Sequence, residues 1–97
     1  MYKRILKIDK QRRLNIPRDL MELVSIKPAD KLAICSCEER KMFLRSPENV
    51  QENVVFGIMK VDDKGRIILP KFSPDFHEVE IFALEGDLYI IPTDDPD

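Results

Sequence analysis

Two arginines stand in matching positions in two similar segments of the chain. Residues 8–18 read IDKQRRLNIPR and residues 61–71 read VDDKGRIILPK. The identical pairs in and just before these segments are Lys7 and Lys60, Asp9 and Asp62, Arg13 and Arg66, and Pro17 and Pro70. The aspartate can accept backbone N–H bonds and close a tight turn, in which Gly65 is free to adopt a left-handed conformation. The arginine then emerges from a rigid turn, where its planar guanidinium suits two-point binding of a phosphate or a guanine edge.

The charge of the chain is distributed unevenly. The net charge of −2 does not by itself indicate a nucleic-acid partner. Residues 1–18 nevertheless carry seven basic side chains and one acidic, a net charge of +6, whereas residues 72–97 carry eight acidic side chains and no Lys or Arg. This asymmetry indicates either an anionic partner at one end of the molecule or two solvated faces that neutralise one another. Composition alone does not distinguish these interpretations.

Residues that could support catalysis or hold a metal ion are few. Cys35 and Cys37 would share one face of a strand, and His77 is the only histidine. Structural metal sites use four ligands, usually from two separated pairs, and an enzyme needs an activated nucleophile or a metal centre. We therefore expect neither an enzyme nor a metal or other cofactor. The cysteines are interpreted as small apolar side chains in a reducing cytosol.

Short strands are expected to position the repeated arginines. Alternating apolar residues predict strands at residues 4–9 and 13–17 with a tight turn between them. Pro17 suits the first position of a short helix, because its missing N–H is no loss there. The apolar residues at helical spacing in this helix are Leu20, Leu23 and Val24. A strand, a polar turn at residues 38–41 and a return strand follow.

The order of elements then restarts in the second half. Strands are expected around the second arginine, and residues 79–92 predict a hairpin that turns at Glu85, Gly86 and Asp87. The segment in the place of the helix is shorter by six residues and is interrupted by Pro74. The second copy has therefore lost most of its helix.

The repeat implies one domain with a shared core. Each copy has about 40–50 residues, which bury too little apolar surface to fold alone. We divide the single domain, residues 1–97, into a first repeat (3–45), a linker (46–53), a shortened second repeat (54–92) and an acidic tail (93–97). The composition, 43% apolar and 35% charged, is typical of a soluble folded protein. With no apolar run of ~20 residues and no signal-peptide pattern, we expect a cytoplasmic protein without membrane contact.

These segments resemble a known family. The stretches KIDKQRRLNIPRDL and SIKPADKL in the first copy, and KVDDKGRIILPK in the second, are similar to the SpoVT/AbrB-type swapped-hairpin domain. That domain occurs in bacterial transcription regulators and in the antidote half of MazE-like toxin–antitoxin pairs. Two copies in one chain, each with an Asp-x-x-x-Arg element, most resemble the MraZ branch, although this chain is shorter than its typical members. The resemblance covers nearly all of residues 3–92.

The resemblance implies both a fold and a function. The fold is mainly β with one or two short helices, in which two ββαββ repeats form an intrachain swapped-hairpin pseudo-dimer barrel. The function is DNA binding by a transcription regulator, cytoplasmic and nucleoid-associated, through the basic hairpin turns. The implied DNA-binding residues are Lys7, Lys10, Arg12, Arg13, Arg18, Lys60, Lys64, Arg66 and Lys71, with Asp9, Asp62 and Gly65 as turn-forming residues. Indirect readout of A·T-rich or flexible DNA is expected because few side chains could read bases, and a homo-oligomer is expected.

Some positions depart from the family pattern. Arg12 stands where glycine is usual, so either the first turn differs or strain of about 1–2 kcal/mol is tolerated to place an extra cation. Ala29 stands where a glycine commonly precedes the aspartate, here Asp30. The alternative function is a protein-binding module, antitoxin-like or acting on a DNA-binding partner, that keeps the scaffold and uses its acidic C-terminal half. The eroded second helix and the net charge of −8 over residues 72–97 favour this alternative, and the paired Asp-x-x-x-Arg elements count against it.

Overall fold

A computed structural model describes residues 3–36, 41–49, 55–69 and 77–93, and within these ranges the protein is mainly β. The elements of the first half are β1 (Lys3–Lys7), β2 (Arg13–Asn15), α1 (Arg18–Leu23), β3 (Lys31–Ser36) and β4 (Met42–Arg45). A short 3-10 helix, η1 (Pro47–Asn49), precedes β5 (Val55–Lys60), β6 (Arg66–Ile68), β7 (Glu78–Leu84) and β8 (Asp87–Pro92). The eroded helix expected around Pro74, residues 38–40 of the expected turn at 38–41, and Cys37 lie outside the described residues.

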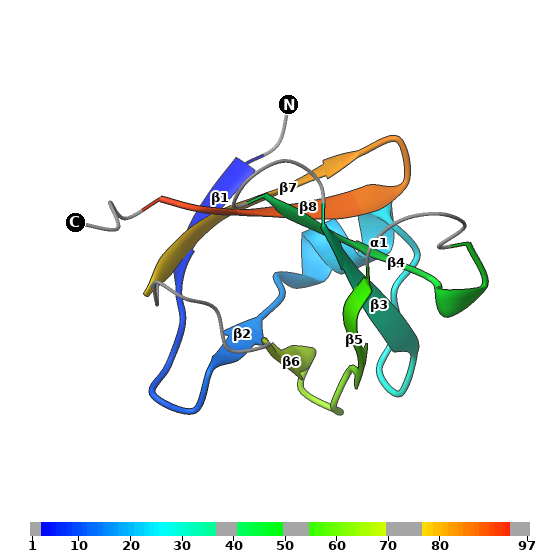
Figure 1. The fold of residues 1–97 in the computed structure, drawn as a ribbon, viewed down its shortest axis with the longest axis horizontal. Helices are drawn as coiled ribbons and strands as arrows, with labels where there is room; N and C mark the ends of the chain where they lie inside the picture. Colours follow the sequence, from blue (N-terminus) through cyan, green and yellow to red (C-terminus); the bar gives the residue numbers. More distant parts are fainter. Residues whose placement is uncertain (1–2, 37–40, 50–54, 70–76, 94–97) are drawn as a thin grey trace.

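The strands of the two repeats are interleaved in one sheet (Figure 1). A six-stranded antiparallel sheet has the order β1-β7-β8-β4-β3-β5, and β2 pairs with β6 in a two-stranded sheet. The first strand of each repeat lies against the third strand of the other, because β1 pairs with β7 and β5 pairs with β3. The last strands, β4 and β8, pair with each other. The strands β1 to β4 of the first repeat correspond to β5 to β8 of the second. If each strand is replaced by its counterpart, the same strand order results, read from the opposite edge of the sheet.

The described strands do not close into a barrel through strand pairing. Figure 1 shows β2 and β6 beneath the sheet, between its edge strands β1 and β5. Within the described ranges no ladder joins β1 to β5. The β2–β6 ribbon is extended by backbone bonds from Ile16 N–H to the Gly65 carbonyl (2.9 Å) and from Leu69 N–H to the Arg12 carbonyl (2.8 Å). A short ribbon therefore fills the space where a barrel would need a continuous ladder.

One apolar core draws on both repeats. At its centre, Leu14 of β2 lies opposite Ile67 of β6, and these side chains are 0% and 1% exposed. The six-stranded sheet contributes alternate residues to the same cluster, including Ile34, Leu44, Ile81, Leu88 and Ile90. Removing water from this surface is the main driving force for folding. Residues of both repeats therefore form one core.

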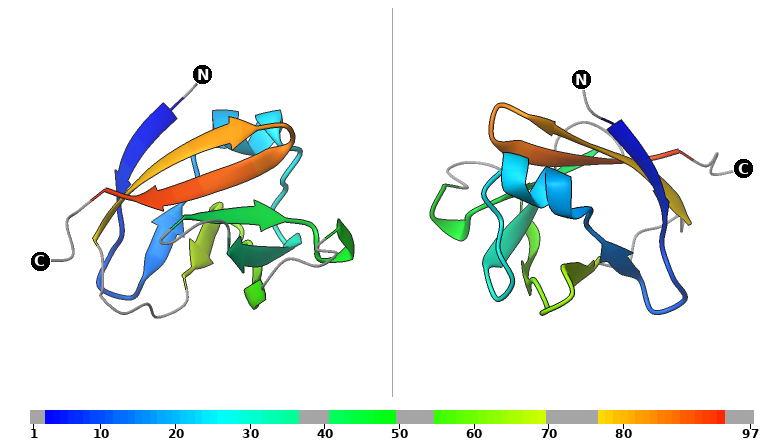
Figure 2. Two further views of the ribbon diagram at one scale, coloured as in Figure 1. Left: turned by 45° about the horizontal axis from the view of Figure 1, so that its top comes forward. Right: turned by 180° about the vertical axis from the view of Figure 1, so that it is seen from behind.

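In the view from behind (Figure 2, right), the helix α1 lies between β1 and β3 and in front of the sheet. It differs from the sequence-based expectation in two ways. Pro17 is the N-cap residue, with an extended ψ of 139°, and not the first helical residue. Leu23 is 61% exposed, whereas Leu20 and Met21 are buried. The short helix therefore buries two adjacent residues, and Val24 follows as its C-cap. Of the three apolar residues predicted at helical spacing, Leu23 was wrong as a buried residue. None of the described helices has the length and apolar character needed to cross a membrane.

Candidate nucleic-acid interface

Asp9 closes the first turn (residues 9–13) with its carboxylate. Its Oδ1 atom accepts the backbone N–H groups of Gln11 at 2.9 Å and Arg13 at 2.8 Å. Its Oδ2 atom accepts the Nε–H of the Arg13 side chain at 2.8 Å. The Asp9 carbonyl in turn accepts the backbone N–H of Arg12 at 3.0 Å. These bonds tie the guanidinium to the same side chain that shapes the backbone.

The second turn (residues 62–66) repeats this geometry bond for bond. The Oδ1 atom of Asp62 accepts the backbone N–H groups of Lys64 at 2.9 Å and Arg66 at 2.8 Å, and its Oδ2 atom accepts Arg66 Nε–H at 2.8 Å. The Asp62 carbonyl accepts the backbone N–H of Gly65 at 3.1 Å. The Asp-x-x-x-Arg spacing thus encodes one turn structure twice.

Each aspartate is held in its charged form. The backbone N–H of Arg13 is the largest cause that lowers the pKa of Asp9, and its guanidinium adds to the effect. The backbone N–H of Arg66 lowers the pKa of Asp62 in the same way. Hydrogen bonds to a carboxylate favour its ionised form. Each turn therefore contains an Asp⁻–Arg⁺ pair, which reduces its net charge.

The pairing leaves one end of each guanidinium available. Both aspartates bind the arginine through Nε, so the terminal Nη1 and Nη2 groups are not used in that bond. Among the described residues, no other hydrogen bond or ion pair engages the side chain of Arg13 or of Arg66. The two side chains are about a third exposed, at 35% and 29%. An arginine fixed at Nε presents its terminal amino groups in a defined direction, which suits binding of a planar or tetrahedral anion.

Arg12 occupies a strained backbone position. Its φ is 65°, and Gly65, its counterpart in the second turn, has a φ of 77°. The turn therefore requires a left-handed residue in both copies, and the first copy keeps a large cation there. A non-glycine residue in this region costs about 1–2 kcal/mol. Backbone strain of this kind clusters at functional sites.

The two turns lie at the same end of the molecule, on either side of the β2–β6 ribbon (Figure 1). Most of the sequence-predicted residues are located there. Lys7 ends β1 and Lys60 ends β5, and both are exposed, as are Lys10 and Lys64 within the turns. Residues 7–13 carry a net charge of +3 and residues 60–66 carry +1. The first turn is thus the more basic one, because the second has one cation fewer and carries Asp63 as an additional acid.

Arg18 lies outside the two turns in sequence, but it shares a groove with the second turn. It is exposed at the start of α1 and lines a groove of about 660 Å³ between the helix and the second turn. Lys27 and Lys64 lie on the same groove, whose apolar lining includes Met21 and Ile26. Arg18 is therefore a flanking cation, and Lys71 lies outside the described residues.

Part of the charge asymmetry is used inside the fold. The basic strand β1 pairs with the acidic strand β7, and Lys3 Nζ lies 3.3 Å from a Glu80 oxygen. Arg45 Nε donates to Asp87 Oδ1 at 3.0 Å. These contacts neutralise acidic groups of the C-terminal half. Apart from the Asp–Arg pairs, the lysines at the turns (Lys7, Lys10, Lys60 and Lys64) form no ion pair within the described part of the chain.

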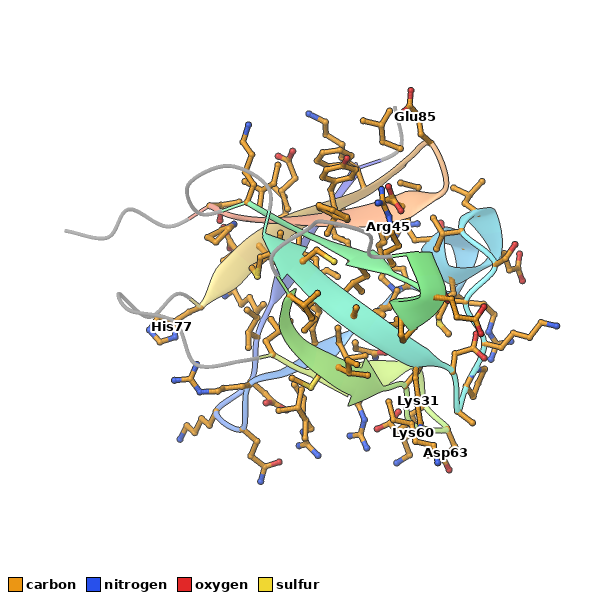
Figure 3. The ribbon with its side chains drawn as sticks, turned by 45° about the vertical axis from the view of Figure 1, so that its right-hand side comes forward. Lys31, Arg45, Lys60, Asp63, His77 and Glu85 are labelled. Atoms are coloured by element: carbon orange, nitrogen blue, oxygen red, sulfur yellow. The ribbon has the colours of Figure 1, made fainter. Side chains whose placement is uncertain are left out.

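Lys31 is a basic residue near the second turn that the sequence analysis missed. It lies directly opposite Lys60, because β3 and β5 pair in antiparallel register. Figure 3 shows Lys31 beside Lys60, in agreement with this register. The only sequence signal was the lysine after Asp30 in the SIKPADK stretch, and a pairing between repeats is needed to connect it to the site.

In the described ranges, no group of His, Cys, Asp or Glu side chains could hold a metal ion. Cys35 is a buried free thiol, and burial is the main cause that raises its pKa, which disfavours the thiolate. No protein-family model matches the sequence, and none of the curated proteins is significantly similar to it.

Proposed function

We propose that this chain is a DNA-binding transcription regulator that contacts double-stranded DNA through its two Asp-x-x-x-Arg turns. The observation that carries the proposal is the repetition of one arginine-presenting turn at one end of a small domain. Two equivalent turns are suited to a ligand with two-fold symmetry, and duplex DNA offers equivalent phosphates on its two strands. A protein with two-fold symmetry commonly binds two related half-sites.

The charges of the two turns support a polyanionic ligand. The terminal amino groups of Arg13 and Arg66 can bind phosphate or guanine bidentately. The exposed lysines that flank each arginine add contacts that release counterions from DNA, so affinity should fall with salt by about 0.9 log units per log unit for each phosphate contacted. Because the two turns supply few base-reading side chains, shape and flexibility of A·T-rich DNA would contribute to selectivity.

The strand pairing supports the intrachain swapped-hairpin interpretation. Each repeat places its first strand on the sheet of the other repeat, and the equivalent strands β2 and β6 pair at the centre. In this proposal one chain supplies the symmetry that a dimer of single-copy domains would otherwise provide. The proposal includes a cytoplasmic, nucleoid-associated location and assembly into homo-oligomers, for which the exposed edges of β1 and β5 are suitable.

The alternative, a protein-binding module that uses the acidic C-terminal half, is less well supported. Glu80 and Asp87 are engaged by Lys3 and Arg45. Glu78 accepts the hydroxyl of Thr93 at 2.7 Å. Two of the described acidic residues of this half, Glu80 and Asp87, are therefore already paired with cations of the fold.

A fluorescence-anisotropy titration tests the proposal. Mixed-sequence and A·T-rich duplexes would be titrated with the unaltered chain and with Arg13→Ala, Arg66→Ala and the double variant, at several salt concentrations. Lys41→Ala is the matched control, because it removes one exposed cation outside both turns. We expect salt-dependent binding that each arginine variant weakens and the control retains. A folded chain that does not bind either duplex at low salt would contradict the proposal.

A further inference from the structure

Two lysines face each other at the edge of the six-stranded sheet. Lys31 begins β3 and Lys60 ends β5, and they form a directly opposed pair in the antiparallel ladder. Both side chains are exposed, and within the described part of the chain neither forms an ion pair. Opposed like charges in a sheet are destabilising. The pair therefore weakens the fold at a point where a neutral or acidic residue would strengthen it.

The other repeat carries opposite charges at the equivalent position. There Lys7 of β1 lies opposite Glu78 of β7. The internal repeat relates Lys7 to Lys60 and Glu78 to Lys31, so the scaffold accepts either charge at this position. Lys31 consequently adds a positive charge beside the less basic second turn, and Glu78 removes one beside the more basic first turn.

The chain holds Lys31 firmly next to the second turn. The backbone N–H of Ala29 donates to the Val61 carbonyl at 2.8 Å, and the Val61 N–H donates to the Asp30 carbonyl at 2.9 Å. The Asp30 carboxylate accepts the backbone N–H of Lys27 at 2.8 Å, which closes the loop that precedes β3. The position of Lys31 is therefore fixed relative to residues 60–66, and Figure 3 shows it beside Lys60.

We infer that Lys31 and Lys60 together bind a backbone phosphate of the DNA, so that the second half-site is completed by a residue of the first repeat. This inference rests on the proposed DNA-binding function. A phosphate placed between two ammonium groups would relieve their mutual repulsion and gain two charge-assisted hydrogen bonds. Glu78 thereby lowers the charge beside the more basic first turn, and Lys31 raises the charge beside the less basic second turn.

A pair of charge exchanges tests the inference. Lys31→Glu gives the second half the charge pattern of the first, and Glu78→Lys gives the first half that of the second. The control is Lys41→Glu, which makes the same charge change outside both turns. Affinity for a short duplex, its salt dependence and the thermal midpoint would be measured for each variant.

The expected effects on stability and binding have opposite signs. Lys31→Glu should raise the thermal midpoint by roughly 2–5 °C, because it removes a like-charge pair. It should also lower the salt slope by about 0.9 and weaken binding roughly tenfold at about 50 mM salt, as expected for one lost phosphate contact. Glu78→Lys should lower the midpoint and increase the salt slope. If Lys31→Glu binds with the affinity and salt slope of the Lys41→Glu control, the inference is wrong while the proposed function stands. Absence of binding by the unaltered chain would overturn both.

Discussion

Replacing Arg12 by glycine is expected to make the protein more stable and its DNA complex weaker. The φ of Arg12, 65°, lies in the left-handed region, and glycine occupies the equivalent position of the second turn. The substitution keeps the turn but removes the steric cost of the side chain. It also removes one cation from the more basic turn.

The magnitude follows from two opposing contributions. Relief of the left-handed conformation stabilises the fold by about 1–2 kcal/mol, and the greater freedom of glycine in the unfolded chain offsets about 0.5–1 kcal/mol of this. The net gain is about 0.5–1 kcal/mol, which corresponds to a rise in the thermal midpoint of about 2–8 °C for a domain of this size. Arg12 also makes an interaction of its own in the fold, so its gain should lie at the lower end.

Ala29→Gly is the matched control for this experiment. Ala29 has a φ of 76° and an exposed, uncharged side chain, so the change relieves the same kind of strain without removing a cation. Thermal and urea unfolding followed by circular dichroism would measure stability, and anisotropy titration would measure binding. We expect both variants to be more stable and only Arg12→Gly to bind DNA less tightly. A decrease in stability for both variants would refute the strain argument, and unchanged affinity for Arg12→Gly would refute its role in binding.

Three further predictions concern the turns and the core. Hydrogen bonds lower the pKa of Asp9 and Asp62 below 3.8 in the folded state. The stability that these bonds contribute is therefore present above about pH 4 and is lost as the pH falls through the lowered pKa values. The urea midpoint of the unaltered chain should drop at acid pH, and it should drop less in the double variant Asp9→Asn/Asp62→Asn. Gly65→Ala should lower stability by about 1–2 kcal/mol or more, because its φ is 77° and an added Cβ would lie 3.1 Å from the Met21 sulfur; equal stability of the variant in urea unfolding would contradict this. Leu14→Ala should cost about 2–5 kcal/mol in the same assay, since the side chain is 0% exposed at the centre of the core, and a loss below about 1 kcal/mol would show that this site is not central to packing.

The turns could be predicted from the sequence because their geometry is local. An aspartate, an arginine four residues later and a left-handed residue just before that arginine are all contained in five consecutive positions. The structure has the left-handed residue at Arg12 that the comparison with Gly65 suggested, so the two turns have the same form and strain is tolerated. Ala29, another position where glycine was expected, also has a positive φ.

The features that depend on contacts between the repeats could not be predicted in this way. The helix was expected to bury Leu23, but the packing of α1 buries Met21 instead, and that choice depends on how the second turn lies against the helix. The pairing of Lys31 with Lys60 joins residues that are far apart in the sequence. The charge asymmetry was ambiguous from composition, and the register of β1 against β7 accounts for part of it as internal pairing.

The most direct test of the central claim is to map the DNA contact on the folded protein. Amide chemical shifts of the ¹⁵N-labelled chain would be followed by NMR during titration with an A·T-rich duplex. The account predicts that the largest changes occur at residues 9–13 and 62–66, and at Lys31 and Lys60, and that added salt reverses them. Changes confined to β7 and β8, or no changes at low salt, would contradict the claim that the repeated turns bind DNA.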